Sequence, residues 1–200
     1  MKIVCATHNP GKLKEFAGAL SEYGATLIAQ SELGITEPVE DGLSFIENAL
    51  IKARHAAALS GLPAIADDSG LEVDALSGRP GLHSARFAGA GAHDAANRAA
   101  LLKALAHTPE HLRTARFYCV LVFVRHARDP RPLIADGLWE GQILTEERGE
   151  GGFGYDPIFF VPSHQCSAAE LPPEEKRRIS HRGQALLRLS QAFTGISCTP

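Results

Sequence analysis

Short apolar runs and helical stripes of apolar side chains succeed one another along this chain. The runs at residues 2–6, 26–30 and 62–66 are bounded by polar or turn-forming residues, a pattern that predicts buried strands. Residues 13–20 and 45–57 instead repeat apolar side chains every three or four positions, which predicts helices that bury one face. The first third of the chain is therefore expected to alternate between strands and helices.

The rest of the chain carries the same two kinds of pattern. They predict helices over residues 93–106 and 184–193, and strands over residues 72–75, 114–126, 133–144 and 158–161. The centre of the longest strand, Cys119 to Val124, is apolar throughout, so we expect both of its faces to be buried. The strand that follows is expected to be its antiparallel partner, with Trp139, the only tryptophan, packed in the core.

Two adjacent carboxylates, Asp67 and Asp68, follow the apolar run that ends at Ala66. Ser69 and Gly70 then break the run, which predicts a strand that enters a turn. Successive strand side chains point to opposite faces, so one carboxylate can face a ligand at the carboxyl end of the strand. A carboxylate there can bind Mg²⁺ or accept a proton from water. The alternative is a turn in which the Asp and Ser side chains bond nearby backbone amides.

A tight turn over residues 7–12 joins the first predicted strand to the first predicted helix. Asn9 suits the N-cap position and Pro10 the first helical position. The free amides of a helix N-terminus favour a phosphate, and Lys12 and Lys14 add positive charge. The glycine and Lys-Ser/Thr spacing of a P-loop is absent, so a capped helix with solvated lysines stays open as an alternative.

Ser44 and Glu47 form a capping box that opens the second predicted helix. Asn48 and Lys52 lie four positions apart, so they share one face of that helix. Lys52 can reach a phosphate if this face looks toward the ligand, whereas a solvated lysine is the alternative. The loop before the helix carries several acids, Glu40 among them.

A glycine-rich stretch at residues 148–157 is the second region with candidate chemistry. Its glycines allow backbone to approach a ligand closely. Phe153 could stack on a base, and Asp156 could accept hydrogen bonds from ring N–H groups. A flexible hairpin with an aromatic side chain that only packs is the alternative.

Three further side chains, Lys176, His181 and Arg182, lie within seven positions near the C-terminal end. The prolines and acids at residues 172–175 predict a helix start just before them, and Gly183 is expected to precede the final helix. The three side chains could face an anion or the edge of a purine. A solvated helix corner is the alternative.

Composition excludes several classes of protein. The chain of 200 residues is 44% hydrophobic and 22% charged, which fits one large globular domain or two small ones. A net charge of -3 gives no overall basic field toward nucleic acid or membrane, and no apolar run approaches the ~20 residues of a membrane span. The four cysteines form no Cys-x-x-Cys pair and the first apolar run is too short for a signal peptide, so we expect reduced thiols in a cytoplasmic protein.

Six stretches in order resemble the inosine triphosphate pyrophosphatase family, and within it the bacterial XTP/dITP diphosphatases. The stretches are residues 6–12, 45–49, 66–71, 80–86, 152–157 and 180–182. The resemblance runs from Val4 to about Leu189, nearly the whole chain. It implies a single α/β domain over residues 1–200, with a long central mixed sheet, flanking helices and two lobes with an active-site cleft between them. It also implies a homodimer.

The activity that the resemblance implies is Mg²⁺-dependent hydrolysis of deaminated purine nucleoside triphosphates (ITP, dITP and XTP) to the monophosphate and pyrophosphate. Such an enzyme keeps these bases out of DNA and RNA. Glu40 and Asp68 would bind Mg²⁺, and Asp68 would also accept the proton of the attacking water. The substrate-binding residues would be Thr7, His8, Asn9, Pro10, Gly11, Lys12, Lys52, Asp67, Ser69, Phe153, Gly154, Tyr155, Asp156, Lys176, His181 and Arg182.

Within this set, residues 7–12 would hold the triphosphate, Lys52 would neutralise phosphate charge, and residues 153–156 would enclose the base. His8 departs from relatives, which often have Gly or Asn there, and its side chain can titrate near neutral pH. Two other functions stay open. One is a pyrophosphatase for modified pyrimidine nucleotides, and the other is a non-catalytic nucleotide sensor, which would not need clustered acids.

Overall fold

The computed structural model describes residues 1–7, 10–21 and 23–193, and the chain divides into two compact units. The first unit comprises Met1–Asp68, Cys119–Gly137 and Gln184–Pro200. The second unit comprises Ser69–Tyr118 and Leu138–Gly183. The predicted single domain and the predicted cleft between two lobes stay predictions.

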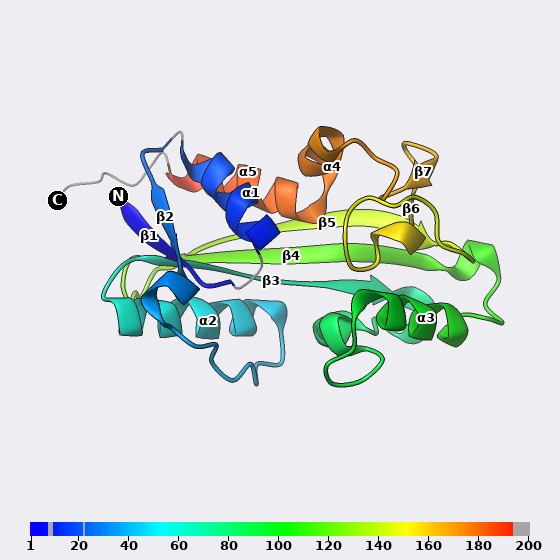
Figure 1. Ribbon diagram of the computed structural model, residues 1–200, viewed down its shortest axis with the longest axis horizontal. Helices are drawn as coiled ribbons and strands as arrows, with labels where there is room; N and C mark the ends of the chain where they lie inside the picture. Colours follow the sequence, from blue (N-terminus) through cyan, green and yellow to red (C-terminus); the bar gives the residue numbers. More distant parts are fainter. Residues whose placement is uncertain (8–9, 22, 194–200) are drawn as a thin grey trace. The chain divides into compact units, whose positions relative to one another are not determined.

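A seven-stranded mixed sheet with helices around it confirms the predicted α/β fold class (Figure 1). In chain order the strands and α-helices are β1 Lys2–Cys5, α1 Pro10–Ser21, β2 Thr26–Ala29, α2 Phe45–Ser60, β3 Ala64–Val73, α3 Asp94–Ala104, β4 Thr114–Val124, β5 Leu133–Ile143, β6 Phe159–Val161, β7 Cys166–Ser167, α4 Pro173–Ile179 and α5 His181–Phe193. The strand order is β2-β1-β3-β4-β5-β6-β7. β1 is parallel to β2 and β3, whereas β6 is antiparallel to β5 and β7. None of the described helices is both long enough and apolar enough to span a lipid bilayer.

In the first unit, helices cover both faces of the strands. Figure 1 shows α1 and α5 on one face and α2 on the other. Phe16 of α1 and Leu189 of α5 are fully buried with Ile3 and Ile65 of the strands. Parallel strands need a crossover between them, and α1 provides it between β1 and β2. These apolar side chains of α1 and α5 therefore face the core, as expected.

The capping box predicted for α2 is confirmed, and the structure shows a cap at each end of the helix. Ser44 Oγ accepts the backbone N–H of Glu47 at 3.3 Å, and Glu47 Oε2 accepts the N–H of Leu43 at 2.8 Å. At the other end Gly61 adopts a φ of 69° and donates its N–H to Ala57. Left-handed backbone favours glycine, so Gly61 ends the helix.

The second unit has a core of aromatic side chains. The ring centroid of Phe117 lies 6.2 Å from that of Trp139 and 4.5 Å from that of Phe159. Leu101 and Leu105 at the C-terminal end of α3 are fully buried in the same cluster. The interpretation of Trp139 as a packing residue is confirmed.

The predicted turn after Asp68 is wrong, because β3 continues through residues 67–70 to Val73. The separate short strand predicted at residues 72–75 is therefore the end of β3. The neighbouring strand β1 ends at Cys5, opposite Ile65. The two carboxylates therefore lie beside the carboxyl end of β1, and β3 continues beyond that end.

The predicted start of the last helix is also wrong, because α5 begins at His181 and contains Gly183. Ser180 Oγ accepts the N–H of Gly183 at 3.2 Å, as a helix N-cap does. A Cβ at Gly183 would clash with the carbonyl oxygen of Arg177. This glycine therefore permits the close approach of α4 to α5, and it does not separate a loop from a helix.

Candidate functional site

The two carboxylates on β3 point to opposite faces of the strand, as the alternation of strand side chains predicts. Asp67 Oδ2 lies 2.8 Å from Lys12 Nζ of α1. Asp68 Oδ1 lies 2.9 Å from Lys52 Nζ of α2. Because α1 and α2 cover opposite faces (Figure 1), each carboxylate is paired with a lysine from a different helix.

Lys52 joins two acids that are far apart in the sequence. Its ammonium contacts Asp68 at 2.9 Å and Glu40 Oε2 at 3.1 Å. All three side chains belong to the first unit, and those of Lys52 and Asp68 are largely buried. The lysine is therefore paired with carboxylates, and the alternative of a solvated lysine does not hold.

Asn48 anchors this group and was not assigned a role from the sequence. Its side chain is buried, its Nδ2 donates to Asp68 Oδ2 at 3.4 Å, and its Oδ1 accepts the N–H of Gly42 at 2.9 Å. A Cβ at Gly42 would lie 2.6 Å from Asn48 Oδ1, so only glycine fits there without a shift. Asn48 thereby ties the loop that carries Glu40 to helix α2. The sequence feature that could have identified Asn48 was its spacing of four residues from Lys52.

The environment of Asp68 makes it a better base than an ordinary carboxylate. Burial raises the pKa of Asp68, and the charge of Lys52 offsets this effect only in part. Burial alone would lower the pKa of Lys52, but the charges of Asp68, Asp67 and Glu40 outweigh it and raise that pKa. Lys52 therefore stays cationic while Asp68 gains proton affinity, a combination that suits general-base chemistry.

Asp67 is only 2% exposed and serves as the partner of Lys12. Burial raises the pKa of the nearby Cys5 thiol, and the charge of Asp67 raises it further, so this thiol is inert. Lys12 lies in the first turn of α1, where helix amides favour an anion. Asp67 thus fixes a cation beside a helix N-terminus.

The other residues of the predicted triphosphate loop are described in part. Thr7 follows β1, and Pro10 and Gly11 begin α1. The predicted roles of His8 and Asn9, including the N-cap, fall on positions outside the described residues.

Glu40 and Asp68 are the two carboxylates that could hold a magnesium ion. Both carboxylates reach the same ammonium, so they face a common point in the first unit. Mg²⁺ prefers one or two carboxylates together with water and substrate phosphate oxygens. Within residues 1–7, 10–21 and 23–193, no three His, Cys, Asp or Glu side chains are grouped to hold a metal. A magnesium ion held by these two carboxylates would take its other ligands from water and from substrate phosphates.

Asp156 holds the glycine-rich loop in shape. It is 3% exposed, and its Oδ2 accepts the N–H of Phe153 at 2.7 Å and contacts the ammonium of Lys176. Gly152 has a φ of 75°, and a Cβ there would clash with Asp156 Oδ2. Asp156 therefore acts on the loop, and its predicted hydrogen bond to a purine ring stays a prediction.

Phe153 projects from this loop, and two cationic side chains lie beside its ring. The residue is 46% exposed, and its stacking on a base stays a prediction. Lys176 Nζ lies 4.9 Å and the guanidinium carbon of Arg182 lies 5.6 Å from the ring centroid. Such distances are those of cation–π contacts. The loop and the α4–α5 corner thus come together in the second unit.

His181 and Tyr155 support this group from below the surface. The His181 ring stacks on Phe117 at a centroid distance of 4.8 Å and an angle of 12°. The Tyr155 hydroxyl donates to the carbonyl of Ser84 at 2.8 Å, and burial raises the pKa of Tyr155 with a further contribution from Asp94. Both side chains are buried, so they fix the positions of their neighbours in the second unit.

The predicted residues fall into two groups, one in each unit. Lys12, Glu40, Lys52, Asp67 and Asp68 form the group of the first unit, and the glycine-rich loop with Lys176, His181 and Arg182 forms that of the second. The first group can neutralise phosphates, bind a metal and accept a proton. The second can stack and hydrogen-bond a base. Ser69 follows Asp68 on β3 as the first residue of the second unit.

Known protein families, sequences and structures match this chain over nearly its full length. The model of the Ham1 family matches residues 3–192. A dITP/XTP pyrophosphatase of Vibrio parahaemolyticus is 59% identical over 188 residues, which cover 94% of each chain. That of Escherichia coli O157:H7 is 58% identical over 192 residues, covering 96% of this chain and 98% of its own. The structure of a HAM1 protein from Coxiella burnetii is similar with a TM-score of 0.93 and 49% identity, covering 98% of this chain and 100% of that chain.

Proposed function

Because the chain belongs to the Ham1 family, we propose that it hydrolyses nonstandard purine nucleoside triphosphates to the monophosphate and pyrophosphate. Relatives that are 56–59% identical carry the name dITP/XTP pyrophosphatase, which supports this substrate class. The observation that carries the proposal is the buried carboxylate of Asp68, held between Lys52 and Asn48 with a raised pKa. ITP, dITP and XTP are the expected substrates.

The residues of the first unit would act on the triphosphate. A nucleoside triphosphate carries about four negative charges, so its hydrolysis needs fixed cations and an aligned water. Lys12 and Lys52 supply the cations, and the first amides of α1 supply hydrogen-bond donors. Asp68 would accept the proton of the attacking water.

Magnesium is the cofactor that we propose, held by Glu40 and Asp68. When bound, the ion would neutralise phosphate charge and lower the pKa of a coordinated water. Lys52 contacts both acids and would keep them in place before the substrate arrives. Asn48 would hold the Asp68 carboxylate in one orientation.

The residues of the second unit would recognise the base. The exposed ring of Phe153 offers a stacking surface, and Arg182 beside it is a fixed hydrogen-bond donor. Hypoxanthine and xanthine present a keto oxygen at C6, whereas adenine presents an amino donor there. Donors from His181 or Arg182 directed at O6 would therefore accept the first two bases and reject adenine.

The cellular role that we propose is removal of deaminated purine nucleotides, which keeps their bases out of DNA and RNA. We propose that the enzyme acts in the cytoplasm as a homodimer. The family membership supports this role. The proposed cellular role does not depend on the chemistry of the site.

Two rival functions have less support. A pyrophosphatase for modified pyrimidines would need a different base site, and the names of the close relatives speak for purines. A nucleotide sensor would not need a buried, activated carboxylate such as Asp68.

A substrate panel tests the proposal against both rivals. Rates of monophosphate formation would be measured for ITP, XTP, dITP, ATP, GTP and dUTP, with Mg²⁺ and with EDTA. We expect rapid Mg²⁺-dependent hydrolysis of the first three and slow hydrolysis of the others. Preference for dUTP would support the pyrimidine rival, and binding without turnover would support the sensor.

A further inference from the structure

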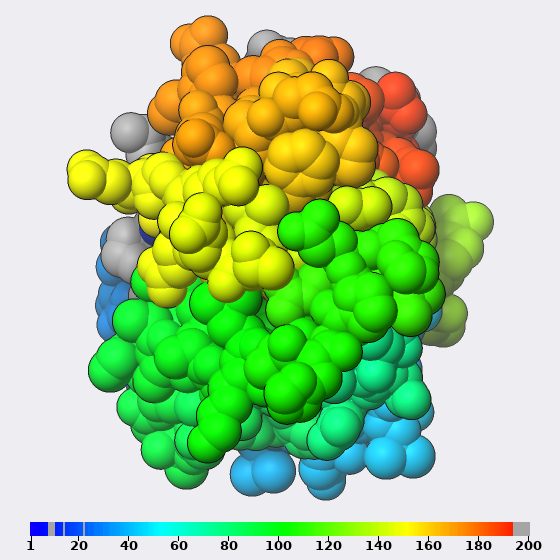
Figure 2. Space-filling view, turned by 90° about the vertical axis from the view of Figure 1, so that its right-hand side faces the viewer, coloured from blue at the N-terminus to red at the C-terminus, as the bar shows by residue number. Residues whose placement is uncertain are grey.

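Helix α3 holds the glycine-rich loop through the backbone of Gly154. Asp94 Oδ2 accepts the N–H of Gly154 at 2.8 Å, and Arg98 Nη1 donates to its carbonyl oxygen at 2.9 Å. Arg98 Nε also donates to Glu147 Oε1 at 2.9 Å, one residue before the loop starts. In Figure 2 the yellow surface of this loop adjoins the green surface that contains α3. Both polar groups of one loop residue are thus bonded to side chains of one helix.

These contacts fix the backbone on one side of Phe153. On its other side the N–H of Phe153 itself is bonded to Asp156. Gly154 adopts a φ of 61°, a left-handed conformation that favours glycine, so the chain turns sharply just after the ring. The half-exposed ring of Phe153 therefore stands on a backbone that is anchored both before and after it.

Helix α3 is a rigid support. The buried side chain of Asn97 donates to the carbonyl of Ala85 at 3.1 Å and accepts the N–H of Ala88 at 2.8 Å. On the next turn Leu101 is fully buried in the core of the second unit. A residue that projects from such a helix can hold a loop at a defined position.

We propose that Asp94 and Arg98 are positioning residues for the purine base. They would keep the Phe153 ring in its stacking orientation before the nucleotide binds, so that binding does not have to order the loop. Neither residue would touch the phosphates or take part in the proton transfer. The inference rests on the proposed function, because it assigns the base to the same loop.

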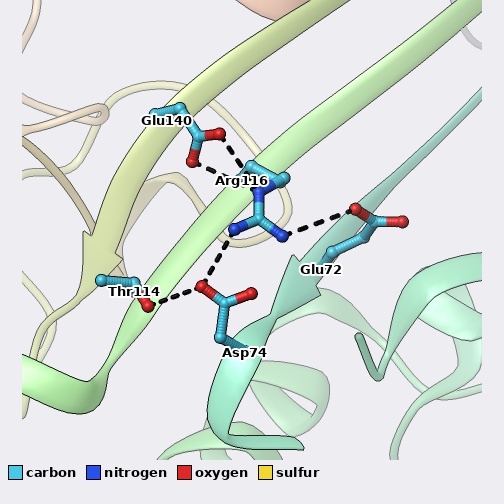
Figure 3. A network of polar contacts seen from close by, with 5 residues as sticks. All are labelled: Glu72, Asp74, Thr114, Arg116 and Glu140. Carbon is cyan, nitrogen blue, oxygen red and sulfur yellow. Dashed lines mark hydrogen bonds and ion pairs between the residues drawn. The ribbon is translucent and has the colours of Figure 1, made fainter. Parts of the chain in front are cut away.

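The test compares Arg98→Ala with a matched arginine outside the loop. Arg116 of β4 belongs to the same unit and bonds Asp74 at 2.9 Å and Glu140 at 3.2 Å (Figure 3). Arg98→Ala should raise the KM for ITP about tenfold and leave kcat within about twofold, because base affinity alone is lost. Arg116→Ala should leave the KM unchanged. Inhibition by inorganic tripolyphosphate, which has no base, should be equal in the wild type and both variants.

Asp94 gives an independent pair of variants on the exposed end of α3. Asp94→Ala removes the acceptor for Gly154 and should raise the KM, whereas Asp94→Asn keeps an acceptor oxygen and should restore most of the affinity. This pair keeps the test decisive if Arg98→Ala does not fold.

Amide hydrogen exchange measures how well the loop backbone is ordered, independently of catalysis. Residues 147–156 should exchange about tenfold faster in Arg98→Ala and Asp94→Ala than in the wild type, and at the wild-type rate in Arg116→Ala. The inference is overturned if the loop variants match Arg116→Ala in both KM and exchange, or if they weaken tripolyphosphate inhibition as much as ITP binding. Failure of the wild type to hydrolyse any purine triphosphate would instead refute the proposed function, and the role in base positioning with it.

Discussion

The ammonium nitrogen of Lys52 lies 2.9 Å from the carboxylate of Asp68, and the two side chains are largely buried. The pair comes from α2 and β3 and belongs to the first unit. Its lysine also contacts Glu40, so one cation orders both acids of the proposed metal site. Burial of Asp68 raises its pKa, which makes this carboxylate a stronger base.

Asp68→Asn should lower kcat by roughly 10²-fold or more, the scale of a lost general base. The variant keeps the shape of the side chain but loses its charge and its basicity. The fold should survive, because the substitution removes no apolar packing. Steady-state kinetics with ITP and a thermal unfolding curve measure the two effects. Asp74→Asn, at an exposed carboxylate of the second unit, is the control and should keep full turnover. Near-wild-type turnover of Asp68→Asn would show that this residue only shapes the strand.

Glu40→Gln should raise the Mg²⁺ concentration for half-maximal activity about tenfold or more, because one of two proposed carboxylate ligands is lost. Glu140→Gln, at an exposed acid paired with Arg116, should leave the Mg²⁺ requirement unchanged. Titration of EDTA-treated enzyme with Mg²⁺ gives the activity curve, and isothermal calorimetry gives the affinity. Equal Mg²⁺ curves for Glu40→Gln and Glu140→Gln would remove Glu40 from the metal site.

Gly152→Ala should weaken ITP binding by about tenfold or more, because its Cβ would displace Asp156 and with it the anchor of Phe153. Gly91 provides a control for backbone strain alone. Its φ of 73° matches the 75° of Gly152, but a Cβ there meets no atom within 4 Å. Gly91→Ala should therefore cost stability in urea unfolding and leave the KM unchanged. The role of Gly152 in the loop is refuted if both variants have the same KM.

Arg182→Ala should lower kcat/KM for ITP strongly, and it should reduce the ratio of kcat/KM for ITP to kcat/KM for ATP. A site built on a hydrogen bond to O6 can reject the mismatched base by roughly 10⁴-fold, and the variant loses that bond. The ITP-to-GTP ratio should change much less, because both bases carry the same O6. Values of kcat/KM for ITP, GTP and ATP in the wild type and the variant provide the measurement. An unchanged ITP-to-ATP ratio would assign Arg182 to phosphate binding or to structure.

The sequence predicted most reliably what is decided locally. The capping box of Ser44 and Glu47 was predicted correctly because a cap is a contact within a few residues. The end of β3 was missed because it depends on where its neighbour β1 stops, a fact of tertiary structure. Gly183 is not the helix boundary that the sequence predicts, because the contact that requires glycine there is with the Arg177 carbonyl of another helix.

In the candidate site too, the sequence predicted what local motifs mark and missed what depends on tertiary contacts. Motifs located Asp67, Asp68 and Lys52, but no local pattern showed that Lys12 would bind one carboxylate and Lys52 the other. Asp94 and Arg98 were missed because they reach a loop more than 50 positions away along the chain.

The identity of the products tests the central claim most directly. Purified enzyme would be incubated with ITP and Mg²⁺, and inosine monophosphate, inosine diphosphate, pyrophosphate and orthophosphate would be quantified by ³¹P NMR during the first turnovers. The account predicts monophosphate and pyrophosphate in equal amounts from the start, with Asp68→Asn nearly inactive. Initial release of orthophosphate with inosine diphosphate left behind would contradict it.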